Sequence, residues 1–222
     1  MERIINFLPI LWDGLQTTLI LTGISLGIGT VVGIIMGFIR AYNIFPLNYL
    51  VYVYEKVLRG IPLLVILLIL WLVPPDFGFR IDRFHAAILG LALRSSAYQA
   101  QIFRGAINSI SRGQVEAAKS IGMSRLQGIR NIILPQVLRL SIPGWSNEFT
   151  IVLKDTSIAL AIGVTELLRR GDQLVVLHSD IALEIFLVVA AIYFVIVVSV
   201  NKGLGIIEEK FRMKGYEVEV ER

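Results

Sequence analysis

The sequence predicts an all-α membrane protein with about five transmembrane helices. Of its 222 residues, 55% are hydrophobic and only 17% are charged, whereas roughly 25% of the residues of a soluble domain carry a charge. The mean hydropathy is +0.73. One uncharged stretch, residues 14–39, exceeds the roughly 20 residues that a helix needs to cross a hydrocarbon core. Because no polar linker divides the chain, we expect a single transmembrane domain over residues 1–222.

The composition also excludes several kinds of site. The chain has no cysteine, so disulfides, thiol catalysis and cysteine-ligated metals are excluded. Its two histidines, His85 and His178, lie far apart in the sequence, and we expect no metal site. The net charge of +4 is small, and much of it flanks apolar stretches. It indicates orientation in a lipid bilayer rather than binding to nucleic acid.

The uncharged stretches set the boundaries of the predicted spans. These cover approximately residues 14–39, 48–75, 84–107, 136–164 and 181–204. Pro74 and Pro75 end the second span, because proline cannot continue a helix. The fourth span is interrupted by proline, and its topology is the least defined by the sequence.

The segments between and after the spans set the predicted orientation. Residues 108–135 form a basic loop, in which Glu116 is the one acidic side chain, and residues 205–222 form a charged tail. Basic loops stay in the cytoplasm. We therefore expect the loop and the C-terminus to be cytoplasmic, and an odd number of spans then places the N-terminus outside.

Small residues recur in the first span at a spacing of four. Gly23 and Gly27 form one pair, and Gly29, Gly33 and Gly37 form a longer series. Small residues at this spacing let helix backbones approach closely in lipid. The pattern fits packing within the chain or an interface with another subunit.

Capping signals predict two short helices in the basic loop. Ser111 with Gln114 is a capping box, and Gly122 can end the first helix in the left-handed conformation. Ser124 with Gln127 repeats the box and opens a second helix, which runs into the membrane near residues 134 and 135.

The first of these helices presents small side chains beside one acid. Glu116, Ala117 and Ala118 give it a smooth surface that suits insertion into a groove on another protein. The alternative is a solvated amphipathic connector without a partner.

These residues resemble the EAA loop of ABC importer permeases. Glu116-Ala117-Ala118, Gly122 and Ile132-x-Leu134-Pro135 match the full pattern E-A-A-x3-G-x9-I-x-L-P. Three further segments, residues 59–64, 95–98 and 147–157, resemble the polar amino acid subgroup of that family. The resemblance covers residues 14–210. Subgroup members commonly have Thr where Ile61 stands and Glu where Gln101 stands.

The resemblance implies a type I ABC importer permease (MetI-like), a multi-pass protein of the inner (cytoplasmic) membrane, with a cytoplasmic coupling helix. Two permeases, identical or different, would pair with two copies of an ATP-binding subunit and with an extracytoplasmic amino acid binding protein. ATP and Mg would bind the ATP-binding subunit, and this chain would hold no cofactor. The coupling residues would be Glu116, Ala117, Ala118, Gly122, Ile132, Leu134 and Pro135.

The chain itself is not expected to hydrolyse ATP. Residues 113–120 differ from the P-loop pattern by one letter, with Ala118 where the second glycine belongs. No strand precedes this stretch, and the caps predict a helix where a phosphate-cradling loop is needed. We therefore expect a transport subunit and not an enzyme.

Charged side chains inside the spans are candidates for the substrate pathway, because burying them in lipid is costly. Arg94 could bind an α-carboxylate and Glu148 an amine. Alternatively, Arg94 and Glu148 pair with each other, and Lys154 and Asp155 lie at the outer interface. The complete set of candidates is Arg94, Ser95, Ser96, Tyr98, Asn147, Glu148, Lys154 and Asp155.

The acidic Glu148 favours basic or neutral polar amino acids as cargo. The main rival function is a secondary transporter or channel for a small polar solute, because such proteins also use intramembrane charges and broken helices. An intramembrane enzyme is a second rival, but the chain lacks a nucleophile paired with a base. The absence of an internal repeat and the odd number of spans favour the importer.

Overall fold

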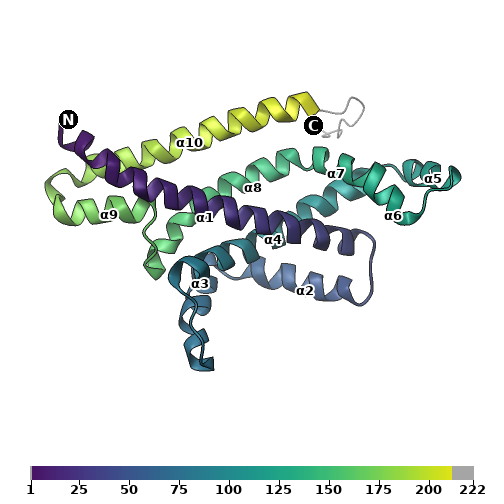
Figure 1. Cartoon of the computed structure of the whole chain (residues 1–222), viewed down its shortest axis with the longest axis horizontal. Helices are drawn as coiled ribbons and strands as arrows, with labels where there is room; N and C mark the ends of the chain where they lie inside the picture. Colours follow the sequence, from purple (N-terminus) through teal and green to yellow (C-terminus); the bar gives the residue numbers. More distant parts are fainter. Residues whose placement is uncertain (1, 212–222) are drawn as a thin grey trace.

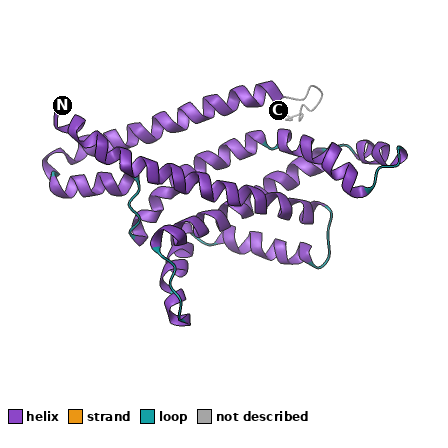
Figure 2. Ribbon diagram, viewed as in Figure 1, coloured by secondary structure: helices purple, strands orange, loops and turns teal. Residues whose placement is uncertain are grey.

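The computed structural model describes residues 2–211, and within that range every regular element is a helix (Figure 2). The molecule is elongated. The N-terminus and α9 lie at one end, and α5 and α6 lie at the other (Figure 1). The elements are α1 (Glu2–Ala41), α2 (Leu47–Gly60), α3 (Leu63–Leu72), η1 (Pro74–Phe77), α4 (Arg83–Ser109), α5 (Arg112–Ser120), α6 (Arg125–Gly128), η2 (Ile129–Ile133), α7 (Leu134–Leu140), α8 (Ile142–Asp155), η3 (Thr156–Ile162), α9 (Leu167–Leu177), η4 (Ser179–Ile181) and α10 (Ala182–Phe211).

The long helices α1 and α4 form the centre of the bundle, and glycines on α1 bring them together. A Cβ atom on Gly33 would lie 2.7 Å from Gln99 Cβ, and one on Gly37 would lie 2.9 Å from Phe103 Cβ. The series at Gly29, Gly33 and Gly37 therefore serves packing within the chain. A Cβ on Gly23 or Gly27 would meet nothing within 4 Å.

The second predicted span is not one helix. The segment predicted as the second span, residues 48–75, is sharply bent, because α2 and the segment from α3 to η1 meet at an angle of 103°. The backbone of Ile61 is extended, and Pro62 is the residue that directly precedes α3. A residue before proline avoids the helical region, so the chain turns here.

The fourth predicted span is confirmed as a broken helix. It consists of α7, α8 and η3, with Ser141 between the first two. The chain then forms α9, which the sequence did not predict, before α10 covers the fifth predicted span.

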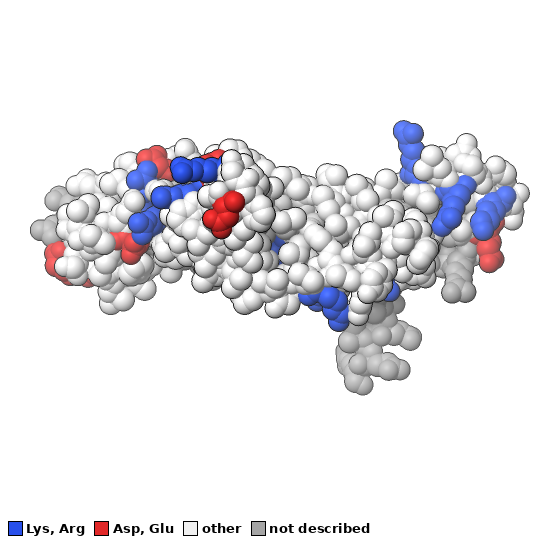
Figure 3. Space-filling view, turned by 90° about the horizontal axis from the view of Figure 1, so that it is seen from below, with Lys and Arg blue, Asp and Glu red and all other residues white. Residues whose placement is uncertain are grey.

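Within residues 2–211, two helical segments are long and apolar enough to cross a membrane, Ile5–Ala41 and Ser179–Lys210, or three if the bent pair at α2 and α3 is one span. The third predicted span coincides with α4, which carries Arg94. Charged side chains gather toward the two ends of the molecule, with a largely uncharged region between them (Figure 3). This distribution is the one expected of a membrane-spanning bundle.

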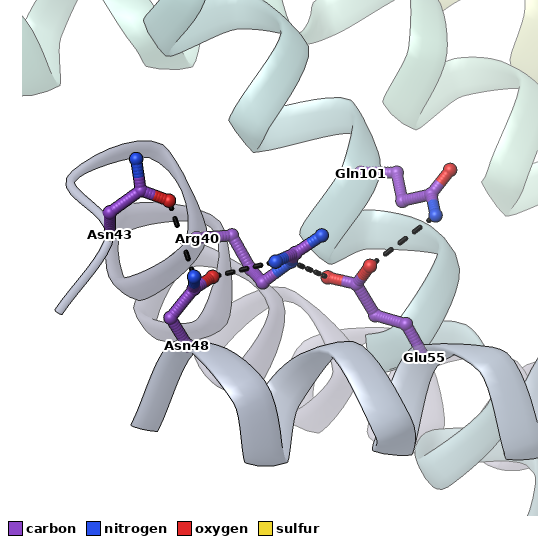
Figure 4. A network of polar contacts seen from close by, with 5 residues as sticks. All are labelled: Arg40, Asn43, Asn48, Glu55 and Gln101. Carbon is purple, nitrogen blue, oxygen red and sulfur yellow. Dashed lines mark hydrogen bonds and ion pairs between the residues drawn. The ribbon is translucent and has the colours of Figure 1, made fainter. Parts of the chain in front are cut away.

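A polar network joins α1, α2 and α4 at the end of the molecule toward α5 (Figure 4). Arg40 Nη1 donates to Asn48 Oδ1 at 2.6 Å, and Arg40 Nε lies 3.7 Å from Glu55 Oε1. Gln101 Nε2 donates to Glu55 Oε2 at 3.4 Å. Glu55 is only 2% exposed, so this network fixes the α1–α2 hairpin against α4.

Candidate functional site

A polar cluster lies where α4 passes α8. Arg94 of α4 forms an ion pair with Asp155. Asp155 is the last residue of α8. Glu148 is 2% exposed and lies beside Ser95 and Arg94. The structure thus brings together four of the predicted pathway residues, Arg94, Ser95, Glu148 and Asp155.

The alternative in which Arg94 and Glu148 pair directly with each other differs from the structure. The direct partner of Arg94 is Asp155, about two helical turns along α8 from Glu148. Glu148 Oε1 is buried and has no hydrogen-bond partner within the described part of the chain. One carboxylate oxygen of the cluster is therefore available to an incoming donor.

Tyr98 lies between two arginines beside this cluster. The guanidinium carbon of Arg94 is 5.1 Å from the centre of the Tyr98 ring, and that of Arg59 is 4.9 Å from it. Both distances fit cation–π contacts. Arg59, at the end of α2, was not predicted as a pathway residue, although it opens the segment that resembles the polar amino acid subgroup.

Ser96 faces away from Glu148 and toward α2. Its hydroxyl lies 2.6 Å from Tyr54 Oη, which also donates to Leu93 O at 3.0 Å. Gln99 is fully buried and donates to Ser95 Oγ at 3.0 Å. Neither Tyr54 nor Gln99 could be singled out from the sequence, because neither is charged.

Two predicted pathway residues lie outside the cluster. Asn147 and Lys154 are exposed. Lys154 lines a separate crevice of about 270 Å³ with Phe186 and Tyr193, between α8, α9 and α10. Residues 2–211 contain no group of three acidic, histidine or cysteine side chains that could hold a metal ion.

The second candidate site is the helical loop at the far end of the molecule. Gly122 follows α5 with φ +79°, and the amide of Met123 donates to Ala118 O at 3.1 Å. This confirms the predicted left-handed termination. The Ser124–Gln127 capping box is also confirmed, with both of its hydrogen bonds present.

The first predicted capping box is wrong. Ser111 stands at the N-cap of α5, but its side chain accepts no capping hydrogen bond. Gln114 instead accepts a hydrogen bond from Gln136 of α7, so its side chain serves a contact between helices. Gln114 thus contributes to a contact between α5 and α7.

Only part of the expected smooth surface is exposed. Glu116 and Ala117 point outward, whereas Ala118 is 5% exposed and faces the loop's own interior. Two large apolar side chains join the exposed surface, Ile121 at 72% and Leu126 at 73% exposed. The pattern of small residues in the sequence did not single out these two side chains.

Contacts from three elements hold this loop on the bundle. The Arg125 guanidinium lies 4.9 Å from the ring centre of Tyr42, which follows α1. Ile132 lies in the π-helical turn η2, and α7 begins with Leu134 and Pro135. A cavity of about 340 Å³ remains between α5, α6 and η2.

The chain is similar in sequence to a family of transport proteins. Residues 29–213 match the family described as "Binding-protein-dependent transport system inner membrane component". The chain belongs to this family. It is 36% identical to the glutamine transport system permease protein GlnP of Escherichia coli strain K12 over 93% of this chain and 94% of that protein. It is also 36% identical to the L-cystine transport system permease protein TcyB of Bacillus subtilis strain 168, over 92% of this chain and 88% of that protein.

Solved structures agree with the family assignment. A crystal structure of an amino acid ABC transporter with histidines contains a chain that is 34% identical, with a TM-score of 0.85 over 94% of this chain and 97% of that chain. An inward-facing structure of the MetNI methionine ABC transporter has a TM-score of 0.77 at 20% identity, over 94% of this chain and 99% of that chain. The second likeness confirms the type I permease fold.

Membership of this family confirms several of the predictions made from the sequence. The chain is a multi-pass permease component of an inner membrane and not an enzyme. A component of a binding-protein-dependent ABC transporter works with a binding protein and with an ATPase. Within the family, the structure places the loop of α5 and α6 at the end of the molecule away from the N-terminus (Figure 1).

Proposed function

We propose that this chain is the permease subunit of an ATP-driven importer for polar amino acids. The observation that carries the proposal is the buried cluster of Arg94, Glu148 and Asp155, with one Glu148 oxygen left without a partner. A free amino acid carries a carboxylate and an ammonium group, so its site needs charges of both signs close together. This cluster supplies them where α4 passes α8 in the bundle.

The charges of the cluster favour a particular orientation of the cargo. Glu148 accepts an ammonium group, and Arg94 can exchange its contact with Asp155 for the α-carboxylate. Ser95 and Tyr98 supply neutral hydrogen bonds. Because two carboxylates face one directly paired arginine, basic and neutral polar amino acids fit this cluster better than acidic ones.

The energy for transport comes from a separate subunit in this proposal. Glu116, Ala117, Ile121 and Leu126 form the surface that enters a groove on the ATP-binding subunit, which binds ATP and Mg. Two such subunits act on two permeases, and the second permease is either an identical chain or a related one. Gly122 sets the direction of α5 as it leaves the membrane domain.

The proposed topology follows from the two ends of the molecule. The loop of α5 and α6 is basic and faces the cytoplasm. The N-terminus, the loop of residues 76–83 and α9 then face outward. In Figure 1 the loop of α5 and α6 lies at the opposite end from the N-terminus and α9, which supports this orientation.

Reconstitution tests the proposal directly. The chain, its ATP-binding subunit and its binding protein are placed in proteoliposomes, and uptake of labelled amino acids is measured with and without enclosed ATP. We expect ATP-dependent uptake of basic or neutral polar amino acids. Uptake that needs no ATP would instead support a secondary transporter.

The Glu148→Gln variant tests the cluster itself. The amide keeps the shape of the side chain but removes its charge, so the half-saturating substrate concentration should rise about tenfold or more. The control is Glu184→Gln, which neutralises an exposed carboxylate of α10 away from the cluster. Unchanged affinity and substrate preference in Glu148→Gln would contradict the assigned contact.

A further inference from the structure

A broad cleft opens at the proposed outer end of the bundle. Its volume is about 770 Å³, and it lies where the loop before α4 meets the loop after η3. Thr17 of α1 and Trp71 of α3 contribute to the walls, together with residues 80–84 and 163–165. None of these residues belongs to the cluster around Glu148 or to the loop of α5.

Two exposed arginines line this cleft without a carboxylate partner. Arg80 and Arg83 form no ion pair within residues 2–211, whereas Arg169, on the same end of the molecule, pairs with Asp172 at 3.0 Å. Arginine binds carboxylates with a planar fork of donors. The cleft therefore offers two free guanidinium groups to a partner.

Arg83 is held in place for such a contact. Its guanidinium carbon lies 5.2 Å from the centre of the Trp71 ring. Below it runs the backbone of Gly163, where φ is +83° and where a Cβ atom would lie 2.8 Å from Arg83 Nη1. Glycine at this position gives the arginine room and permits the turn.

The acid that lines the cleft, Asp82, is hydrogen-bonded at the start of α4 and forms no ion pair with Arg80 or Arg83 within residues 2–211. Asp82 caps α4, and its carboxylate accepts hydrogen bonds from the amides of Phe84 and His85 at 3.0 and 3.2 Å. Its second oxygen contacts the His85 ring. The hydrogen bond with the His85 side chain, joined by those from the amides, lowers the pKa of Asp82, so the carboxylate stays ionised and directed toward its own helix.

We infer that this cleft docks the extracytoplasmic binding protein through a carboxylate side chain of that protein, which Arg80 and Arg83 bind. The inference rests on the proposed function and its topology, because they place a soluble protein against this face. Charge complementarity argues for an acidic contact, since two arginines stand against one acid in the cleft and neither forms an ion pair within residues 2–211. Such a contact also steers the encounter between two proteins.

The test uses the assembled importer in proteoliposomes and measures ATP hydrolysis as the concentration of substrate-loaded binding protein rises. Arg80→Gln and Arg83→Gln should each raise the half-saturating concentration of binding protein about tenfold and leave the maximal rate unchanged. The double variant should also weaken the dependence of that concentration on salt. Arg169→Gln, which removes a paired arginine outside the cleft, should behave as the wild type.

The outcomes separate the inference from the proposed function. Stimulation of the wild type by binding protein, with the same half-saturation in the double variant, would overturn the docking site alone. A lower maximal rate at unchanged half-saturation would place the arginines in the transport pathway and would also overturn it. If Arg83→Gln fails to assemble, Arg80→Gln decides, because Arg80 is exposed in a loop. A wild type that binding protein does not stimulate would contradict the proposed function itself.

Discussion

Gly33 shows how one residue sets the distance between the two central helices. A Cβ atom there would lie 2.7 Å from Gln99 Cβ and 3.1 Å from the backbone nitrogen of Ala100. Backbone atoms in the middle of a long helix cannot move aside as the end of a flexible side chain can. The same spacing at Gly27 leads to open space, so the two glycines differ in role although the sequence gives them the same pattern.

Replacing Gly33 by alanine should destabilise the protein. The added methyl group overpacks the contact between α1 and α4, at a cost of roughly 1–3 kcal/mol. Thermal unfolding of the purified chain in detergent measures the effect. The matched control is Gly27→Ala, which should be neutral or stabilising by about 1 kcal/mol, because alanine is the better helix former. Equal effects of the two changes would contradict the close packing at Gly33.

The polar cluster shows what single residues reveal in advance. Arg94, Glu148 and Asp155 could be singled out because charges inside spans are costly. Their pairing could not be predicted from the sequence, since the partner of Arg94 depends on how α4 and α8 are rotated against each other. Arg59 and Tyr54 were missed for the same reason: their proximity to Tyr98 and Ser96 depends on the packing of α2.

At the scale of elements, the bend between α2 and α3 is the clearest departure from the sequence pattern. Apolar residues continue on both sides of Ile61 and Pro62, so composition alone describes one span. The local rule that a residue before proline avoids the helical region would have predicted the break. α9 was missed because its residues mix charged and apolar side chains in a segment assigned to a loop.

The α1–α2 hairpin should depend on the charge of Glu55. Glu55→Gln leaves Arg40 largely buried without an acid, although Asn48 still accepts one of its hydrogen bonds. Breaking a buried pair costs roughly 3 kcal/mol or more. We expect the apparent Tm in detergent to be lower for Glu55→Gln than for the wild type. The control Glu184→Gln, which changes an exposed acid, should leave the Tm unchanged. A wild-type Tm for Glu55→Gln would show that the network does not stabilise the hairpin.

The turn after α5 should require a residue that accepts a positive φ. Gly122 has φ +79°, and nothing lies within 4 Å of a Cβ atom added there. Alanine would therefore suffer backbone strain of about 1–2 kcal/mol but no steric clash. Asparagine tolerates this conformation better and serves as the matched variant.

Coupling efficiency is the measurement for this turn. Gly122→Ala should lower the amount of substrate transported per ATP hydrolysed, because the helix would leave the membrane domain in a changed direction. Gly122→Asn should remain close to the wild type. If both variants couple as the wild type does, the direction of α5 does not depend on this residue.

At the scale of the whole molecule, the sequence predicted the class of fold, the broken fourth span and the two helices of the basic loop. These features follow from local patterns of hydropathy, charge and capping. The exposure of Ile121 and Leu126 and the inward turn of Ala118 depend on how the loop folds back on Tyr42 and α7. Contacts between distant segments decide such details, and local patterns do not contain them.

The most direct test of the account is purification of the tagged chain from its native membrane in a mild detergent, with its partners identified by mass spectrometry. Glu116→Arg reverses the charge of the exposed face of α5, and Glu184→Arg makes the same change on α10 as a control. The account predicts that an ATP-binding subunit accompanies the wild type and Glu184→Arg but not Glu116→Arg. Recovery of the subunit with all three chains, or with none while other membrane complexes remain intact, would contradict coupling through α5.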